Sequence, residues 1–125
     1  ICNNMILGIS MIAVSESFSM AEKLGLDAQT LFDITSSSSS QCWAMTSYLP
    51  VPGPVPSSPA NRDYQPGFTA AMMAKDMRLA ENAASSVGQK IDLASNALKF
   101  YQKYIDSGSG SRDFSGIFTM ISKDE

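Results

Sequence analysis

A carboxylate stands in the apolar face of the helix that the sequence predicts over residues 68–87. When Phe68 is placed at zero on a helical wheel, Asp76 falls at about 80°, inside an apolar arc of about 180°. A carboxylate inside an apolar face is costly unless it is paired or hydrogen-bonded. Asp76 is therefore expected either to have a structural partner on a neighbouring helix or to face a cleft that holds a ligand. The arc consists of Phe68, Met72, Met73, Met77, Leu79 and Ala80.

Two further polar residues raise the same question. Lys75 falls at the edge of that arc, where a long side chain reaches either water or a ligand. Asn4 shares a helix face with Leu7, Gly8 and Met11, so its amide needs hydrogen-bond partners. A satisfied contact between helices and a ligand-binding amide both meet that need. Gly8 has no side chain and lets another backbone or a ligand come close.

The chain lacks the residues or spacings that several common kinds of catalytic and binding site require. The sequence contains no histidine, which removes the commonest general base and metal ligand. Cys2 and Cys42 have no metal-ligand spacing, so we expect two unpaired thiols in a reducing compartment and no metal site. Residues 108–110, Gly-Ser-Gly, follow no strand and are not a dinucleotide fingerprint. The serines at 36–40 have no nearby base to activate them.

The composition is that of one globular domain. The chain has 125 residues, of which 44% are hydrophobic and 17% are charged. Its net charge is −3 and it has no basic run, so a nucleic-acid surface is not expected. The longest apolar run, residues 5–14, is too short to span a bilayer.

A long first helix should position Asn4. Residues 1–24 are predicted to form it, with Lys23 in the last turn and Gly25 just past the end. Its apolar residues cover more than one face, so other helices or a second domain should cover it. Ile1 and Cys2 are poor caps, so the chain is expected to be a domain cut from a longer protein, with any targeting peptide upstream.

The remaining elements are expected to be shorter helices and loops. Helices are predicted at 28–34 after an Asp27 cap, at 42–45, at 68–87 before Gly88, at 91–105, and at 114–121 after an Asp113 cap. The serines at 36–40 should form a turn. All six prolines lie between Pro50 and Pro66, which predicts an ordered loop that is neither helix nor central strand. No segment alternates with a period of two, so the fold class is all-α.

An ordered set of short motifs resembles a known family. It consists of Cys2-Asn3-Asn4-Met5, Glu22-Lys23-Leu24-Gly25-Leu26-Asp27, Cys42-Trp43, Pro50-Val51-Pro52-Gly53, Tyr64-Gln65-Pro66-Gly67-Phe68, Ala74-Lys75-Asp76-Met77 and Asp113-Phe114-Ser115. In order and spacing these motifs resemble the C-terminal domain of the 3-hydroxyisobutyrate dehydrogenases, within the β-hydroxyacid dehydrogenase family. The resemblance covers essentially the whole chain.

The resemblance implies a fold and a site. Residues 1–125 would be the all-α domain for substrate binding and dimerisation, and a Rossmann domain that binds NAD would lie upstream. The family has a catalytic lysine followed four positions later by an asparagine. Asn4 matches that asparagine, which places the lysine one position before Ile1, on the same helix face. By the same resemblance Asn4 and Phe68 bind substrate, Asp76 joins Asn4 in catalysis, and Lys75 binds NAD.

The implied activity is oxidation of 3-hydroxyisobutyrate to methylmalonate semialdehyde with NAD, a step of valine catabolism. The chain alone would be inactive, because it holds neither the lysine nor a phosphate-binding loop. A related reductase of glyoxylate, succinic semialdehyde or tartronate semialdehyde remains an alternative. So does a non-catalytic helical interaction or oligomerisation module, which would leave Asn4, Lys75 and Asp76 scattered.

The expected partners follow from the same resemblance. They are the hydroxy acid, NAD and further copies of the protein, with no nucleic acid and no membrane. The expected location is the mitochondrial matrix in a eukaryote and the cytoplasm in a bacterium.

Overall fold

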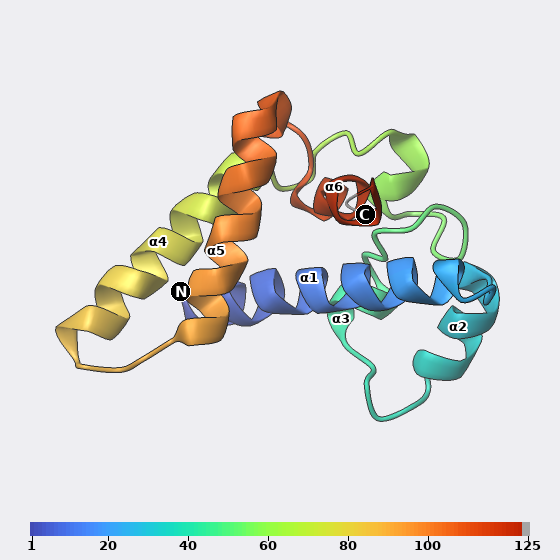
Figure 1. Ribbon diagram of the computed structural model, residues 1–125, viewed down its shortest axis with the longest axis horizontal. Helices are drawn as coiled ribbons and strands as arrows, with labels where there is room; N and C mark the ends of the chain where they lie inside the picture. The colour runs from blue at the N-terminus through green and yellow to red at the C-terminus, as the bar shows by residue number, and fades with distance from the viewer. Residues whose placement is uncertain (124–125) are drawn as a thin grey trace.

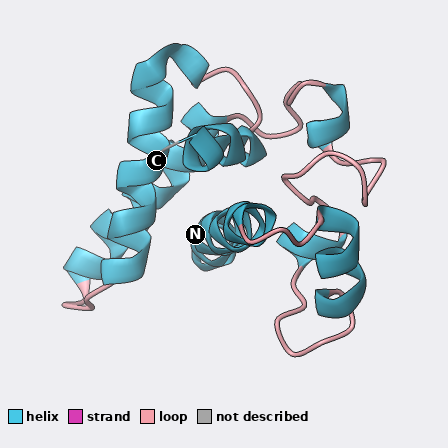
Figure 2. Ribbon diagram, turned by 45° about the vertical axis from the view of Figure 1, so that its right-hand side comes forward, coloured by secondary structure: helices cyan, strands magenta, loops and turns pink. Residues whose placement is uncertain are grey.

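The computed structural model describes residues 1–123, and this part of the chain consists of helices and loops (Figures 1 and 2), which confirms the all-α prediction. An isolated backbone bridge joins Thr69 to Asp113. The α-helices are α1 (Cys2–Lys23), α2 (Ala28–Thr35), α3 (Trp43–Thr46), α4 (Ala70–Ser86), α5 (Asp92–Tyr104) and α6 (Ile117–Lys123). The shorter turns are the 3-10 turns η1 (Pro59–Arg62) and η3 (Phe114–Gly116) and the π turn η2 (Ile105–Ser109).

Helix α1 is the centre of the fold. The antiparallel pair α4 and α5 packs across its N-terminal half, α6 lies along its middle, and α2 and α3 lie on its other side (Figure 1). Helix α1 contacts five other helices, from α2 to α6, so it is covered on more than one side as its sequence predicts. By length and composition alone α1 is also apolar enough to cross a membrane, but here it packs as the core helix of a helical domain.

The ends of the helices follow their local chemistry. Gly25, with φ +89°, comes directly after the C-terminal cap of α1, as expected. The Asp27 carboxylate accepts the Thr30 N–H at 3.0 Å and caps α2. Helix α4 begins two residues later than predicted, because the Thr69 hydroxyl accepts the Met72 N–H at 3.1 Å and acts as the cap.

The proline-rich segment is an ordered loop. The buried hydroxyl of Tyr64 donates to the Pro50 carbonyl at 2.7 Å and ties its two ends together. The expectation that it contains no helix was wrong at one place, the 3-10 turn η1. Pro59 stands at the first position of that turn, where a missing N–H breaks no helical hydrogen bond.

Candidate functional site

Asn4 and Asp76 meet where α1 passes α4. The Asn4 Nδ2 donates to the Asp76 Oδ2 at 2.6 Å, and both side chains are half-buried. Asp76 thus has the partner that its place on an apolar face requires. Its second oxygen, Oδ1, accepts no hydrogen bond from the described residues. The Asn4 Oδ1 in turn accepts from the Asn3 Nδ2 at 3.1 Å, which fixes the orientation of the amide.

Gly8 sets the spacing of the two helices one turn from Asn4. A Cβ on Gly8 would lie 2.9 Å from the Met77 sulfur and 3.1 Å from the Met73 sulfur. The buried hydroxyl of Tyr101 also donates to the Gly8 carbonyl, at 2.9 Å. Gly8 was expected to admit another backbone or a ligand, whereas its close neighbours here are the side chains of Met73 and Met77. The close contact holds α1 and α4 at the distance that lets Asn4 reach Asp76.

An exposed face of α4 surrounds Asp76. Met72, Lys75, Asp76 and Leu79 follow one another at helical spacing on this face, which we call the α4 stripe. Met72 is 51% exposed and Leu79 is 42% exposed, so these two members of the apolar arc are not buried in the described structure. The described neighbours of α4 cover only the adjoining side, which carries Met73, Ala74, Met77 and Ala80. The two charged residues Lys75 and Asp76 therefore lie between the exposed apolar side chains of Met72 and Leu79.

Lys75 and Phe68 occupy different parts of this surface. Lys75 is exposed, and its ammonium can reach an anionic group held outside the chain. Phe68 is half-buried just before the cap of α4, with its ring edge-on to Phe114 at 5.8 Å between centroids. Since Phe68 precedes Asp76 by eight residues, the two are separated by about 12 Å along the helix. The structure thus joins Asn4 to Asp76 directly, with Lys75 beside them, and leaves Phe68 in the turn that precedes α4.

The carboxylate of Asp113 was recognised from the sequence only as a cap. Asp113 is fully buried and accepts five hydrogen bonds. Its Oδ1 accepts from the Tyr48 hydroxyl at 2.7 Å and from the N–H groups of Gly67 and Phe68 at 2.9 and 3.1 Å. Its Oδ2 accepts from the N–H and the hydroxyl of Ser115, which confirms the predicted cap. The Asp-x-Ser spacing gave a signal for the local bonds, but nothing in the sequence indicated the distant ones.

Tyr48 joins Asp113 to a row of aromatic rings. Its ring stacks on Trp43 at 5.0 Å and on Phe114 at 5.4 Å, and Phe114 contacts Phe68. Burial, and then the hydrogen bond to Asp113, raises the pKa of Tyr48 well above its usual range. Tyr48 is therefore a neutral hydrogen-bond donor at physiological pH.

Trp43 forms one wall of a groove beside α1. The ring is 52% exposed. The groove has a volume of about 400 Å³ and is lined by Asn3, Ile6, Leu7, Ser10, Cys42, Trp43 and Ala44. Asn3 of this groove donates to Asn4, so the groove adjoins the Asn4–Asp76 hydrogen bond. In the sequence Trp43 stands out only as part of the Cys42-Trp43 motif, although the one tryptophan of the chain was a usable signal.

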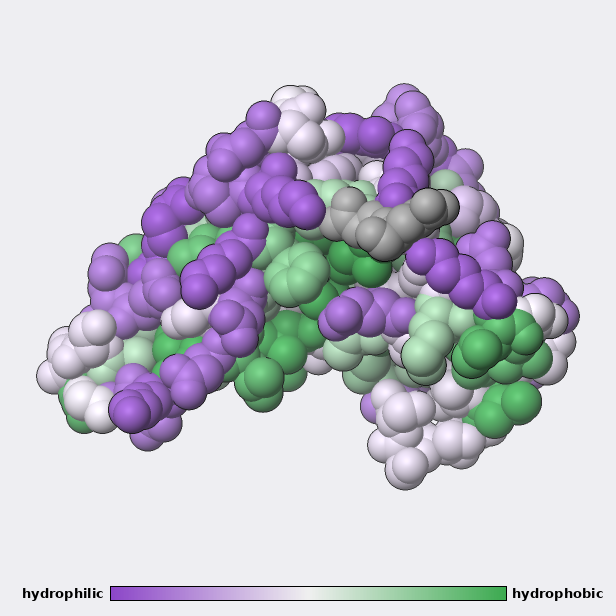
Figure 3. All heavy atoms as spheres, viewed as in Figure 1, coloured by the Kyte–Doolittle hydropathy of each residue, from purple (hydrophilic) through white to green (hydrophobic). Residues whose placement is uncertain are grey.

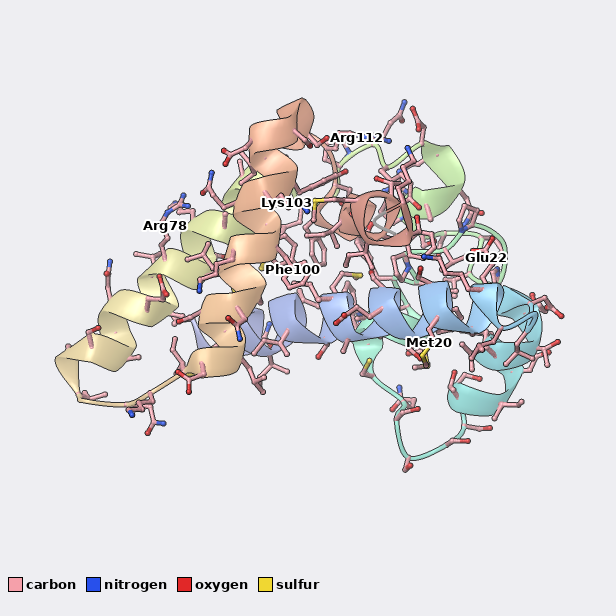
Figure 4. The ribbon with its side chains drawn as sticks, viewed as in Figure 1. Met20, Glu22, Arg78, Phe100, Lys103 and Arg112 are labelled. Carbon is pink, nitrogen blue, oxygen red and sulfur yellow. The ribbon has the colours of Figure 1, made fainter. Side chains whose placement is uncertain are left out.

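A second apolar groove lies where α5 crosses α1. Hydrophobic atoms gather along this crossing in Figure 3, and Phe100 lies over it in Figure 4. Ile9, Ala13, Leu93 and Phe100 line the groove, and Leu93 is 71% exposed. We call this surface the α1–α5 groove.

The polar residues of the site do not form a metal centre. Across residues 1–123, no three His, Cys, Asp or Glu side chains lie close enough to hold an ion together. Both cysteines are free thiols. Lys75 is an exposed cation directly beside Asp76 on α4.

Comparison with known proteins gives consistent matches. The family model described as NAD-binding of NADP-dependent 3-hydroxyisobutyrate dehydrogenase matches residues 1–121. The chain is 46% identical over its full length to the mitochondrial 3-hydroxyisobutyrate dehydrogenase of Drosophila melanogaster, and covers 39% of that protein. It is 46% identical over 97% of its length to a probable 3-hydroxyisobutyrate dehydrogenase of Mycobacterium tuberculosis (strain H37Rv), of which it covers 41%.

A solved structure of the same family also matches this chain. The structure of Mycobacterium tuberculosis 3-hydroxyisobutyrate dehydrogenase with L-serine matches with a TM-score of 0.92 and 45% identity, over 96% of this chain and 41% of that one. The chain thus spans about two fifths of the length of the relatives it matches.

Proposed function

The chain belongs to the 3-hydroxyisobutyrate dehydrogenase family, and from this premise we propose that it is the helical domain of an enzyme that oxidises 3-hydroxyisobutyrate to methylmalonate semialdehyde. The proposed cofactor is NAD, and the proposed context is valine catabolism. The observation that carries the proposal is the Asn4–Asp76 hydrogen bond of 2.6 Å on the exposed α4 stripe, with Lys75 beside it.

Each residue has a role in this proposal. Asn4 orients the hydroxy acid, because its amide is held by Asp76 on one side and Asn3 on the other. Asp76 fixes that amide and keeps one carboxylate oxygen available in the site. The lysine expected one position before Ile1 would lie on the Asn4 face of the helix, where it takes the hydroxyl proton and stabilises charge on the oxygen.

The remaining roles concern the cofactor and the substrate wall. When bound, NAD supplies the hydride acceptor for the carbinol carbon. Lys75 holds a phosphate or ribose oxygen of the dinucleotide, and the apolar side chains of the α4 stripe exclude water around it. Phe68 closes the substrate end of the surface. The chain by itself is proposed to be inactive, because the Rossmann domain and the lysine belong to the longer protein.

The proposal also includes the domains and copies of the protein that would cover the exposed surfaces of this chain. We propose that residues 1–125 form one substrate-binding and dimerisation domain, that the upstream Rossmann domain covers the α4 stripe, and that a second copy of the protein covers the α1–α5 groove. The proposed location is the mitochondrial matrix if the source is a eukaryote, as the Drosophila relative is named mitochondrial, and the cytoplasm if it is a bacterium.

A second candidate substrate class has one observation in its favour. The Mycobacterium tuberculosis relative was solved with L-serine, which is also a 3-hydroxy acid. The test is to assay NAD reduction by the full-length protein with 3-hydroxyisobutyrate, L-serine, and the reduced products expected of a glyoxylate or tartronate semialdehyde reductase. The proposal predicts the highest kcat/KM for 3-hydroxyisobutyrate. No NAD reduction with any of these acids would support the non-catalytic interaction module instead.

A further inference from the structure

Asp113 is the one charged side chain among residues 1–123 that is buried, with none of its surface exposed. A buried carboxylate is destabilising unless hydrogen bonds replace its water. The five donors around Asp113 do so without any cation in hydrogen-bond contact. Such a group is a precise anchor, because every donor points at a fixed pair of oxygens.

The donors on Oδ1 come from two segments that are distant in sequence. Tyr48 lies 65 residues before Asp113, in the loop that follows α3, and carries the stack against Trp43. Gly67 and Phe68 form the turn that leads into α4. One oxygen atom therefore fixes the backbone of Phe68 relative to the aromatic row. The other oxygen is satisfied locally by Ser115 and fixes the carboxylate itself.

The turn is closed tightly around this oxygen. A Cβ on Gly67 would lie 2.7 Å from the Tyr48 hydroxyl and 3.9 Å from the Asp113 Oδ1. The Phe68 carbonyl also accepts the Phe114 N–H at 2.8 Å, on the opposite side of the same residue. Phe68 is thus held at both of its backbone polar groups by residues 113 and 114.

The start of α4 has its own, separate anchors. The Ala70 N–H donates to the Arg112 carbonyl at 2.9 Å, and the Ala71 N–H donates to the Gly110 carbonyl at 3.0 Å. The Asp113 carboxylate contacts neither N–H group. Loss of the carboxylate should therefore free the Phe68 N–H and loosen this residue, while α4, with Lys75 and Asp76, stays in place.

We propose that Asp113 is a positioning residue: through the N–H groups of Gly67 and Phe68 it fixes the Phe68 ring at the substrate end of the site. This inference rests on the proposed function, and it makes Asp113 a determinant of hydroxy-acid affinity without contact to the substrate. Cofactor affinity is set elsewhere, on α4.

The test uses the full-length protein and the variant Asp113→Asn. Asparagine keeps one acceptor oxygen, but its NH₂ group would face the N–H and O–H donors that now bind the other carboxylate oxygen. These hydrogen bonds are therefore weakened with little change in side-chain volume. The KM for the hydroxy acid should rise on the order of tenfold, because a displaced binding group loses its aligned contacts. The Kd for NAD should stay within about twofold of the wild-type value, since the anchors of α4 remain.

The matched control is Tyr64→Phe. It removes another buried tyrosine hydroxyl, which donates to the Pro50 carbonyl at 2.7 Å rather than to the Asp113 carboxylate. Its KM should be that of the wild type. If Tyr64→Phe raises the KM as much as Asp113→Asn does, or if Asp113→Asn weakens NAD and substrate equally, the role of Asp113 is merely structural and the proposal is overturned.

A second readout separates this inference from the proposed function. Amide hydrogen exchange of the full-length protein should show faster exchange at Gly67 and Phe68 in Asp113→Asn, with unchanged exchange at residues 74–80. Unchanged exchange at Gly67 and Phe68 overturns the positioning role even if no hydroxy acid is oxidised. Should Asp113→Asn not fold, Ser115→Ala removes the hydroxyl that donates to Oδ2 and so loosens the carboxylate itself. Faster exchange at Gly67 and Phe68 is then expected, and its absence overturns the proposal.

Discussion

The amide of Asn4 and the carboxylate of Asp76, 72 residues apart in the chain, are joined by a hydrogen bond of 2.6 Å. This bond links α1 to α4 beside the point where Gly8 brings the two helices closest. A change in the distance between the helices therefore changes the geometry of the polar pair. Packing and the proposed chemistry depend on the same contact.

Removing the ammonium of Lys75 should weaken NAD binding. In the full-length protein, Lys75→Ala is expected to raise the Kd for NAD about tenfold or more, because a charge-assisted hydrogen bond contributes roughly 1.5–3 kcal/mol. Titration of the protein with NAD, followed by fluorescence or calorimetry, measures this. Lys99→Ala, which removes an exposed lysine from α5, is the control and should bind NAD as the wild type does. Equal affinities for wild type and Lys75→Ala would remove Lys75 from the cofactor site.

Much of the fold was predictable because its signals are local. As predicted, Gly25 follows the end of α1, and the carboxylates of Asp27 and Asp113 cap the helical segments that follow them. The start of α4 was missed by two residues, because the Thr69 hydroxyl caps the helix, whereas the helix was predicted to begin at Phe68. Boundaries depend on such single contacts, whereas the helical period does not.

The site was predictable only in part, for a related reason. The wheel position of Asp76 predicted a partner or a cleft, and the helix face of Asn4 predicted a need for hydrogen-bond partners, but their pairing with each other was not predicted. The exposure of Met72 and Leu79 could not be deduced, since it depends on which side of α4 the other helices cover. The hydrogen bonds from Tyr48 and Phe68 to Asp113 join residues that are 65 and 45 positions apart, and no periodic pattern in the sequence indicates them.

The tyrosines should resist ionisation until the chain unfolds. Burial raises the pKa of all four, that of Tyr64 to about 12 and those of Tyr48, Tyr101 and Tyr104 above the usual value as well. Because the unfolded chain loses these protons near pH 10 and the folded chain does not, the contribution of the tyrosines to stability should be fully present below about pH 10 and be lost as the pH rises above it. Absorbance of tyrosinate and helical circular dichroism, followed together, should therefore change in one transition. Reversible ionisation near pH 10 with the helices intact would contradict the burial of these groups.

The isolated 125-residue chain should self-associate through its exposed apolar surfaces. Leu93, at 71% exposure, lies in the α1–α5 groove, so Leu93→Glu should weaken association without unfolding the chain. Leu24, at 76% exposure, lies at the end of α1 and outside this groove, so Leu24→Glu is the matched control and should associate like the wild type. Sedimentation equilibrium on the three proteins measures the effect. A wild-type chain that is monomeric at all concentrations would argue against this surface as an interface.

The most direct test of the proposed site is the kcat of full-length Asn4→Ala with 3-hydroxyisobutyrate at saturating NAD. Asn4 is expected to act mainly on the reacting substrate, so kcat and kcat/KM should fall together, by about tenfold or more. Asn82→Ala, which truncates an exposed asparagine of α4, should keep the wild-type kcat. If folded Asn4→Ala turns over 3-hydroxyisobutyrate as fast as the wild type and Asn82→Ala, the Asn4–Asp76 pair is only a contact between helices and the site lies elsewhere.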